Sequence, residues 1–63
     1  MIEGTWTNEG HTLEFKLNND GTCRIYESYE ASQQEMTSHM RVSFENATKY
    51  QDKYIKLGYD KIS

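Results

Sequence analysis

The chain has 63 residues, of which 35% are hydrophobic and 13% aromatic, and its seven Lys and Arg against ten Asp and Glu give a net charge of −3. This length suits a single domain over residues 1–63, and the aromatic content argues against a disordered chain. The basic residues form no run that could neutralise successive phosphates, so the sequence disfavours nucleic acid as a partner.

Three further features bear on where the protein is found. No stretch approaches the ~20 consecutive apolar residues of a membrane helix. Met1 is followed directly by Ile2-Glu3, without the basic and apolar segments of a signal peptide. A single cysteine, Cys23, excludes an internal disulfide. We therefore expect a cytoplasmic protein with no membrane contact.

Four segments carry apolar residues at every second position, which is the pattern of half-buried strands. The pattern predicts a mainly β fold, a small antiparallel meander of four to five strands with one dry and one wet face. The expected strands cover residues 2–8, 11–18, 22–29, 37–46 and 53–62. The expected core consists of Trp6, Leu13, Phe15, Leu17, Ile25, Met40, Val42, Phe44, Ile55 and Leu57.

The first predicted turn joins the first two strands. Trp6 and Leu13 share a face only if the loop has an even number of residues, either Glu9-Gly10 or residues 8–11. We favour the four-residue loop, because a two-residue turn would require a positive φ at Glu9.

The second predicted turn lies in the sequence Asn-Asn-Asp-Gly-Thr at residues 18–22. Placing Leu17 opposite Cys23 leaves Asn19-Asp20-Gly21 as a three-residue loop. The last position of such a loop takes a left-handed conformation, which suits Gly21. Hydrophobic pattern and turn chemistry therefore predict the same register.

Two later connections are less regular. Residues 29–36 show no alternation and contain good helix formers, so they form either one short helix across the sheet or a long connection. Placing Phe44 opposite Ile55 leaves an even loop over residues 47–52, in which Asn46 could cap a helical turn.

The stretch Gly4-Thr5-Trp6, followed by an amphipathic strand and an Asp-Gly-Thr turn, resembles the opening hairpin of lipocalin-like proteins. In that family a Gly-x-Trp begins the first strand of an eight-stranded barrel, and the Trp closes one end. The resemblance covers residues 4–27, and 63 residues are too few for such a barrel around a ligand cavity. We therefore interpret Trp6 as a core aromatic of the first hairpin.

The residues that most often carry chemistry form no recognisable constellation. Cys23 alternates inward beside Ile25, so we expect a buried thiol and not a nucleophile. His11 and His39 share no ligand-pair spacing with Cys23, and we expect ordinary surface histidines. The sequence predicts no catalytic residue, no metal site and no cofactor, so we do not expect an enzyme.

The five tyrosines are the remaining unusual feature. Tyrosine is favoured in strands, which gives a structural explanation. Exposed tyrosine is also enriched at protein interfaces, because it offers a large, stiff contact area with a polar tip. On that interpretation the wet face of the sheet is a protein-binding surface. Its expected residues are Arg24, Tyr26, Tyr29, Arg41, Tyr50 and Tyr54.

Two functions follow from these predictions. The first is a small protein-binding module, for example an inhibitor of a larger protein like the small phage-encoded accessory proteins, by analogy of size and charge. The second is a half-barrel that closes around a small ligand by dimerisation. The first and last strands of a meander would be unpaired edges above a partly wet apolar face. We therefore expect a homodimer or an obligate larger protein partner.

Overall fold

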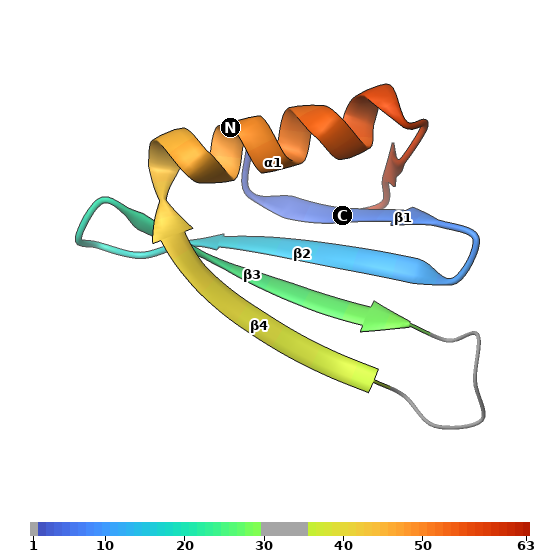
Figure 1. The fold of residues 1–63 in the computed structure, drawn as a ribbon, viewed down its shortest axis with the longest axis horizontal. Helices are drawn as coiled ribbons and strands as arrows, with labels where there is room; N and C mark the ends of the chain where they lie inside the picture. The colour runs from blue at the N-terminus through green and yellow to red at the C-terminus, as the bar shows by residue number, and fades with distance from the viewer. Residues whose placement is uncertain (1, 30–35) are drawn as a thin grey trace.

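A computed structural model describes residues 2–29 and 36–63. Within these ranges five strands form one antiparallel sheet in the order β4-β3-β2-β1-β5, and one helix packs against it (Figure 1). The elements are β1 (Gly4–Asn8), β2 (His11–Leu17), β3 (Thr22–Tyr29), β4 (Met36–Ser43), α1 (Phe44–Lys56) and β5 (Asp60–Lys61). The predicted class, a small mainly β antiparallel meander with a short helix, is confirmed.

The first hairpin has the predicted pairing but not the predicted loop. Trp6 lies opposite Leu13, and the last pair before the turn is Asn8 with His11. The loop is therefore Glu9-Gly10, with φ values of 47° and 81°, and the expected four-residue loop is wrong. A two-residue turn with positive φ at both positions matches the twist of the flanking strands. That match outweighs the cost of about 1–2 kcal/mol for a left-handed Glu9.

The second hairpin is confirmed in register and in turn geometry. Leu17 lies opposite Cys23, and the Asn18 N–H donates to the Thr22 carbonyl oxygen at 2.9 Å. This closes the loop over residues 19–21, in which Gly21 has the left-handed φ of 82°. The Asp20 side chain accepts a hydrogen bond of 3.1 Å from the Thr22 N–H, which further fixes the turn.

The C-terminal third differs from the prediction. The expected strand at 37–46 is confirmed as β4, although it ends at Ser43. The expected strand at 53–62 is wrong over 53–56, which belong to α1, and only Asp60–Lys61 of it is a strand. The expected pairing of Phe44 with Ile55 is wrong, because both residues belong to α1.

The sequence left open whether residues 29–36 form a short helix or a long connection. Residues 30–35 of this segment lie outside the described residues. Tyr29 and Met36, at its two ends, belong to β3 and β4.

The local sequence explains why α1 forms. The Ser43 hydroxyl accepts a hydrogen bond of 3.2 Å from the Asn46 N–H, so Ser43 is the N-cap and Asn46 is not. Ala47, Tyr50 and Tyr54 recur at intervals of three and four residues, which places them on one helix face. Short isolated helices are only marginally stable in water, so it is the packing of this face against the sheet that stabilises α1.

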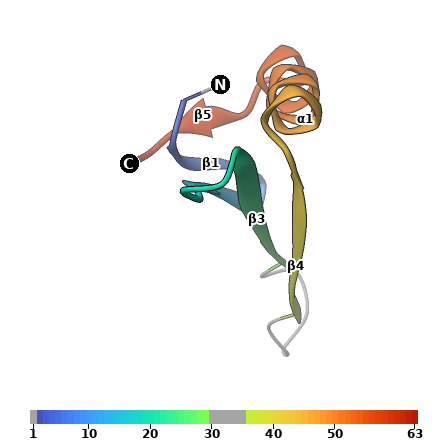
Figure 2. The ribbon, with the colours of Figure 1, turned by 90° about the vertical axis from the view of Figure 1, so that its left-hand side faces the viewer.

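The core lies between α1 and the concave face of the sheet, which curves around the helix (Figure 2). Its buried apolar side chains are Trp6, Leu13, Phe15, Cys23, Ile25 and Ala47. All of these except Ala47 were predicted to be buried. The predicted Val42 is half-buried and packs against the same cluster.

Five residues of the expected core are exposed instead. They are Leu17, Met40, Phe44, Ile55 and Leu57. Leu17 and Met40 have the parity of the core, but Leu17 is the last residue of β2 and Met40 lies on an edge strand. The other three lie in α1 or directly after it, where the parity of a strand does not apply.

The edges of the sheet are β4 and β5, so the last predicted strand supplies one edge as expected, whereas the first predicted strand is not an edge. β1 lies inside the sheet because the chain end folds back along it. The Thr5 N–H donates to the Ser63 carbonyl at 2.9 Å, and the Ile62 N–H donates to the Thr5 carbonyl at 2.8 Å. The eight-residue strand β4 is the long edge of the molecule.

Phe15 and Phe44 differ in their expected contribution to stability. Phe15 is 1% exposed and meets Trp6 edge to face, so Phe15→Ala should lower the free energy of unfolding by about 3–5 kcal/mol. Phe44 is 39% exposed, so Phe44→Ala should cost less than half as much. Urea unfolding followed by circular dichroism measures both, and equal losses would contradict this core.

Gly10 and Gly21 are the left-handed positions of the two hairpin turns, with φ of 81° and 82°. A β-carbon at either position costs about 1 kcal/mol in this conformation. Gly10→Val and Gly21→Val should therefore lower the melting temperature by similar amounts. A Gly10→Val variant with an unchanged melting temperature would contradict the two-residue turn.

Candidate functional site

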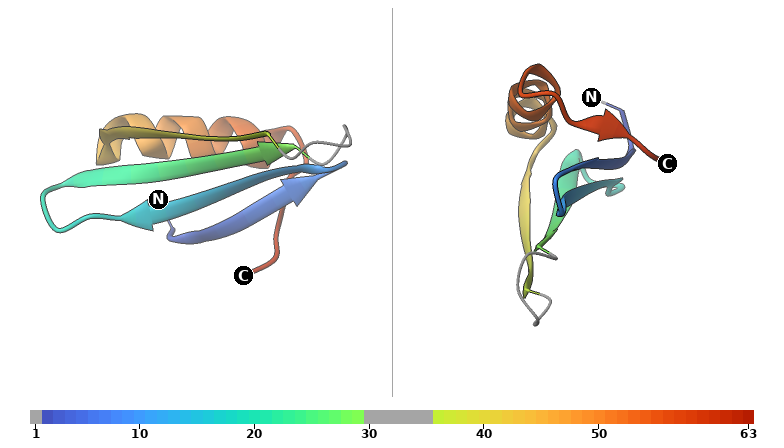
Figure 3. Two further views of the ribbon diagram at one scale, coloured as in Figure 1. Left: turned by 90° about the horizontal axis from the view of Figure 1, so that it is seen from below. Right: turned by 90° about the vertical axis from the view of Figure 1, so that its right-hand side faces the viewer.

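One face of β2, β3 and β4 points away from α1, and no described element covers it (Figure 3). Because Phe15 and Ile25 point into the core, their neighbours in each strand point to this open face. Arg24, Tyr26 and Arg41, three of the predicted binding residues, lie there together. Arg24 is directly opposite Arg41 in the register of β3 and β4.

Three cations form one row across this open face. Lys16 is opposite Arg24, and Arg24 is opposite Arg41, so the row runs over β2, β3 and β4. Directly opposed side chains have Cβ atoms about 4.5–5.5 Å apart, and like charges in such pairs are destabilising. No acidic residue stands within the row. The predicted Leu17–Cys23 register already implied the Lys16–Arg24 pair, whereas Arg41 joins only through the pairing of β4.

Asp20, from the turn between β2 and β3, lies at the end of this row. It forms an ion pair with Arg41 and accepts a hydrogen bond from the Thr22 hydroxyl. The Thr22 hydrogen bond and the Arg41 guanidinium hold the pKa of the Asp20 carboxyl below its usual value. Both side chains of the ion pair are about half exposed, so the pair contributes little stability and leaves Arg41 accessible.

An aromatic row runs beside the cationic one. Tyr26 lies between Glu14 on β2 and His39 on β4 in the sheet register. The rings of Tyr26 and His39 are stacked, with centroids 5.7 Å apart, and the Lys16 ammonium is 6.0 Å from the Tyr26 ring. His39 is exposed, as expected for a surface histidine.

The other predicted binding residues, Tyr29, Tyr50 and Tyr54, lie on the opposite side of the sheet. Tyr50 and Tyr54 belong to α1, with ring centroids 5.0 Å apart, and Tyr50 packs on Phe15 at 6.4 Å. The expectation that Tyr54 shares the wet face with Tyr26 is wrong, because residues 44–56 are helical and face the core side. The predicted set is thus divided between two faces.

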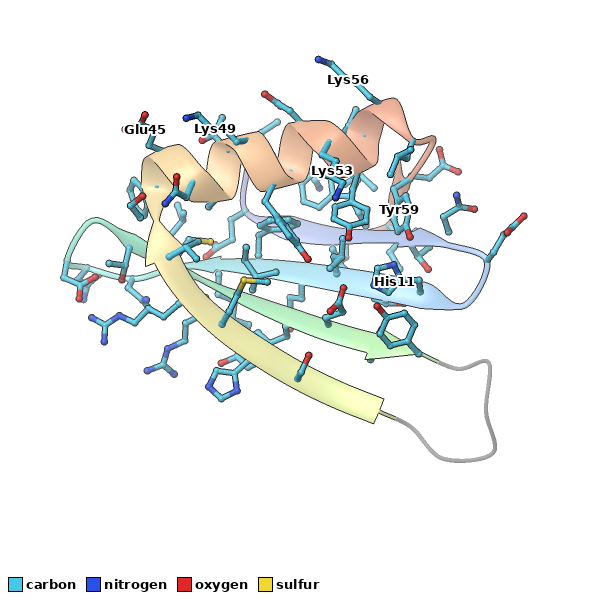
Figure 4. All side chains as sticks on the ribbon, viewed as in Figure 1. His11, Glu45, Lys49, Lys53, Lys56 and Tyr59 are labelled. Carbon is cyan, nitrogen blue, oxygen red and sulfur yellow. The ribbon has the colours of Figure 1, made fainter. Side chains whose placement is uncertain are left out.

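His11 joins these tyrosines in a polar network that the sequence did not reveal (Figure 4). Its Nε2 lies 2.7 Å from a Glu27 carboxylate oxygen, and its Nδ1 is hydrogen-bonded to the Tyr59 hydroxyl. The ring stacks on Tyr29 with centroids 4.3 Å apart and meets Tyr54 edge to face. The His11 side chain is 12% exposed, so the expected surface histidine is wrong. Its parity with the core residues of β2 was the available signal, but Tyr59 is 48 residues away in sequence.

The chemistry of this network favours a structural role. Burial, with neighbouring Tyr54 and Glu27, raises the pKa of the Tyr59 phenol, which stays neutral at ordinary pH. A phenolate nucleophile would need the opposite shift. Burial likewise raises the pKa of the Cys23 thiol, away from the reactive thiolate. Within the described residues, no group of three His, Cys, Asp or Glu side chains could hold a metal ion.

No protein-family model, curated protein or solved structure matches the chain. The open face and the His11 network are therefore interpreted from their own geometry. Across the two described ranges, no helix is long and apolar enough to cross a membrane.

The half-buried Tyr50 and Tyr59 predict a loss of stability at alkaline pH. Burial, together with a hydrogen bond to Tyr54, raises the pKa of Tyr50 in the folded chain, and the pKa of Tyr59 is also raised. A tyrosine in the unfolded chain ionises near its ordinary pKa of about 10. This stabilisation should therefore be complete below about pH 10 and decline as the pH rises above it.

Urea unfolding at about pH 8 and about pH 11 measures this effect, on either side of the ordinary tyrosine pKa. Tyr50→Phe should lose less free energy of unfolding between the two pH values than the wild type does. Tyr26→Phe, on the open face, is the matched control and should behave as the wild type. A Tyr50→Phe variant with the full pH dependence would contradict the assignment.

Proposed function

We propose that the chain is a small protein-binding module whose contact surface is the open face of β2, β3 and β4. The observation that carries the proposal is the row Lys16–Arg24–Arg41. Three opposed cations cost the fold stability, and an acid at the central position would remove that cost. A sequence that breaks a local rule of stability in this way is typical of a functional site.

The neighbouring side chains suit protein recognition. Tyr and Arg are enriched among the residues that dominate binding energy at interfaces, and Tyr26 stands beside two arginines here. A standard interface buries about 800 Å² on each partner. That area is roughly a fifth of the 4483 Å² surface of the described chain, which three strands can supply. Charge complementarity favours a partner with an acidic surface.

Such a module acts by occupying a surface of its partner. The form that we propose is an inhibitor of a larger protein, similar to small phage-encoded accessory proteins, on the grounds of size and charge already given. The alternative of a ligand-binding half-barrel gains no support from the fold, because α1 packs on the concave face that would line its cavity. The homodimer and the cytoplasmic location stay predictions.

Arg24→Glu is the sharpest test, because it should separate stability from binding. A glutamate between Lys16 and Arg41 turns two repulsive pairs into attractive ones, so the free energy of unfolding should rise by about 0.5–1 kcal/mol. The same change removes the centre of the cationic row and should abolish partner capture. Urea unfolding and quantitative mass spectrometry of proteins retained from an extract of the source cell measure the two effects.

Lys49→Glu is the matched control, since it makes the same charge change on the outer side of α1 (Figure 4). It should retain the partner at the level of the wild type. Equal capture by the wild type, Arg24→Glu and Lys49→Glu would refute the open face as the binding surface. Loss of capture by both variants would show a dependence on net charge alone, and would refute it as well.

A further inference from the structure

β4 offers an unpaired edge next to the cationic row. It is eight residues long and pairs with β3 without interruption from Thr22–Ser43 to Tyr29–Met36. Natural edge strands are often short, bulged, blocked by proline or protected by charged side chains. β4 is long and has neither proline nor a bulge, so its protection is the charge of Arg41, which disfavours a basic segment.

The pairing of β4 fixes which backbone groups face outward. The Phe44 N–H donates to the Gly21 carbonyl at 3.2 Å, which makes this pair a hydrogen-bonded one. Hydrogen-bonded and non-bonded pairs alternate along an antiparallel ladder. Met40 and Val42 therefore direct their N–H and C=O groups toward β3, whereas His39 and Arg41 direct theirs away from the sheet. No described strand lies on that outer side.

A strand added to this edge would extend the cationic row by one position. The residue opposite Arg41 would share the open face with Arg41, Arg24 and Lys16. An acidic side chain there would give Arg41 a second anionic partner beside its half-exposed ion pair with Asp20, and a basic one would be repelled. On the other side of the added strand, alternate residues would meet Met40, which is 37% exposed on the α1 side of β4.

A second copy of this chain does not fit the edge. β4 has the sequence Met-Thr-Ser-His-Met-Arg-Val-Ser and contains no Asp or Glu. Two β4 strands paired with each other would place no acid opposite Arg41. They would also bring two copies of the cationic row toward one junction, where their charges repel. The charge of the edge therefore points to a different chain.

From these observations we propose that the β4 edge binds an extended protein segment in which acidic and apolar residues alternate. The segment adds a sixth strand, its acidic side chains lie on the open face against Arg41, and its apolar side chains cover Met40. This inference rests on the proposed protein-binding function and names the kind of segment that is bound. Backbone hydrogen bonds to His39 and Arg41 supply affinity, and the alternation supplies specificity.

The test uses the full chain and a synthetic capped peptide of alternating Glu and Val. On binding, the amide protons of His39 and Arg41 should become protected from hydrogen exchange, while those of Met40 and Val42 are already protected. Arg41→Glu should weaken the peptide about tenfold or more, as expected when one favourable charge contact becomes repulsive. Lys49→Glu, with the same charge change on α1, should bind as the wild type does.

Two control peptides distinguish the contribution of charge to binding from the contribution of backbone hydrogen bonds. A Gln-Val peptide should bind at least about tenfold more weakly, since it lacks the charge. A Glu-Val peptide that is N-methylated at alternate residues should not bind, since it cannot donate to the edge. Equal binding of the methylated peptide, or protection that omits His39 and Arg41, would overturn strand addition. Tighter binding of an oligothymidylate than of the Glu-Val peptide would overturn the protein segment in favour of nucleic acid.

The outcomes separate this inference from the proposed function. If Arg24→Glu abolishes capture of the cellular partner but the Glu-Val peptide does not bind, strand addition at β4 is wrong and the open face remains the binding surface. If the peptide binds but capture is indifferent to Arg24→Glu, the edge site stands and the open-face function is wrong.

Discussion

A sheet has two faces, and in the described chain a single helix is available to cover them. α1 packs into the concave side, where the apolar side chains of β1, β2 and β3 converge. Among the described residues that contact forms the only substantial core, so the other face of the sheet is exposed to solvent. This one contact therefore determines which face of the sheet is covered and which is exposed. The placement of every candidate binding residue follows from it too.

The join between α1 and the sheet is made by polar groups as well as apolar ones. Gln51 is 3% exposed, and its amide both donates to the Ile2 carbonyl at 2.8 Å and accepts from the Ile2 N–H at 3.0 Å. At the other end, the Tyr59 hydroxyl meets His11, which holds the chain after α1 against β2. Within the described residues, no buried side-chain nitrogen or oxygen lacks a hydrogen-bond partner. These contacts rigidify a fold whose last strand has only two residues.

On the open face, in contrast to the α1 side of the sheet, side chains of like charge lie opposite one another. Its cations oppose one another across three strands, and Asp20, which forms an ion pair with Arg41, comes from a turn outside the row. Solvent screens part of this repulsion, so the fold tolerates the row without being stabilised by it. The long free edge of β4 carries a similar liability, because unpaired strand edges invite association. Both liabilities lie on the same strand, at Arg41, and an acidic strand from a partner would relieve both at once.

The sequence by itself determined the features that depend on neighbouring residues. Alternation and turn chemistry are local, so the two hairpins, the Leu17–Cys23 register and the burial of Trp6, Leu13, Phe15 and Ile25 could be predicted. The helix could not, because Phe44 and Ile55 continue the alternation of strands, and the helical spacing of Ala47, Tyr50 and Tyr54 is favoured only by contact with the sheet. The same holds for the site. Arg41 reaches Lys16 and Arg24 through the pairing of β4 with β3, and His11 reaches Glu27 and Tyr59 across 16 and 48 residues. Such contacts depend on the topology of the chain. The topology brings distant segments together only when α1 packs on one face of the sheet and leaves the other face exposed.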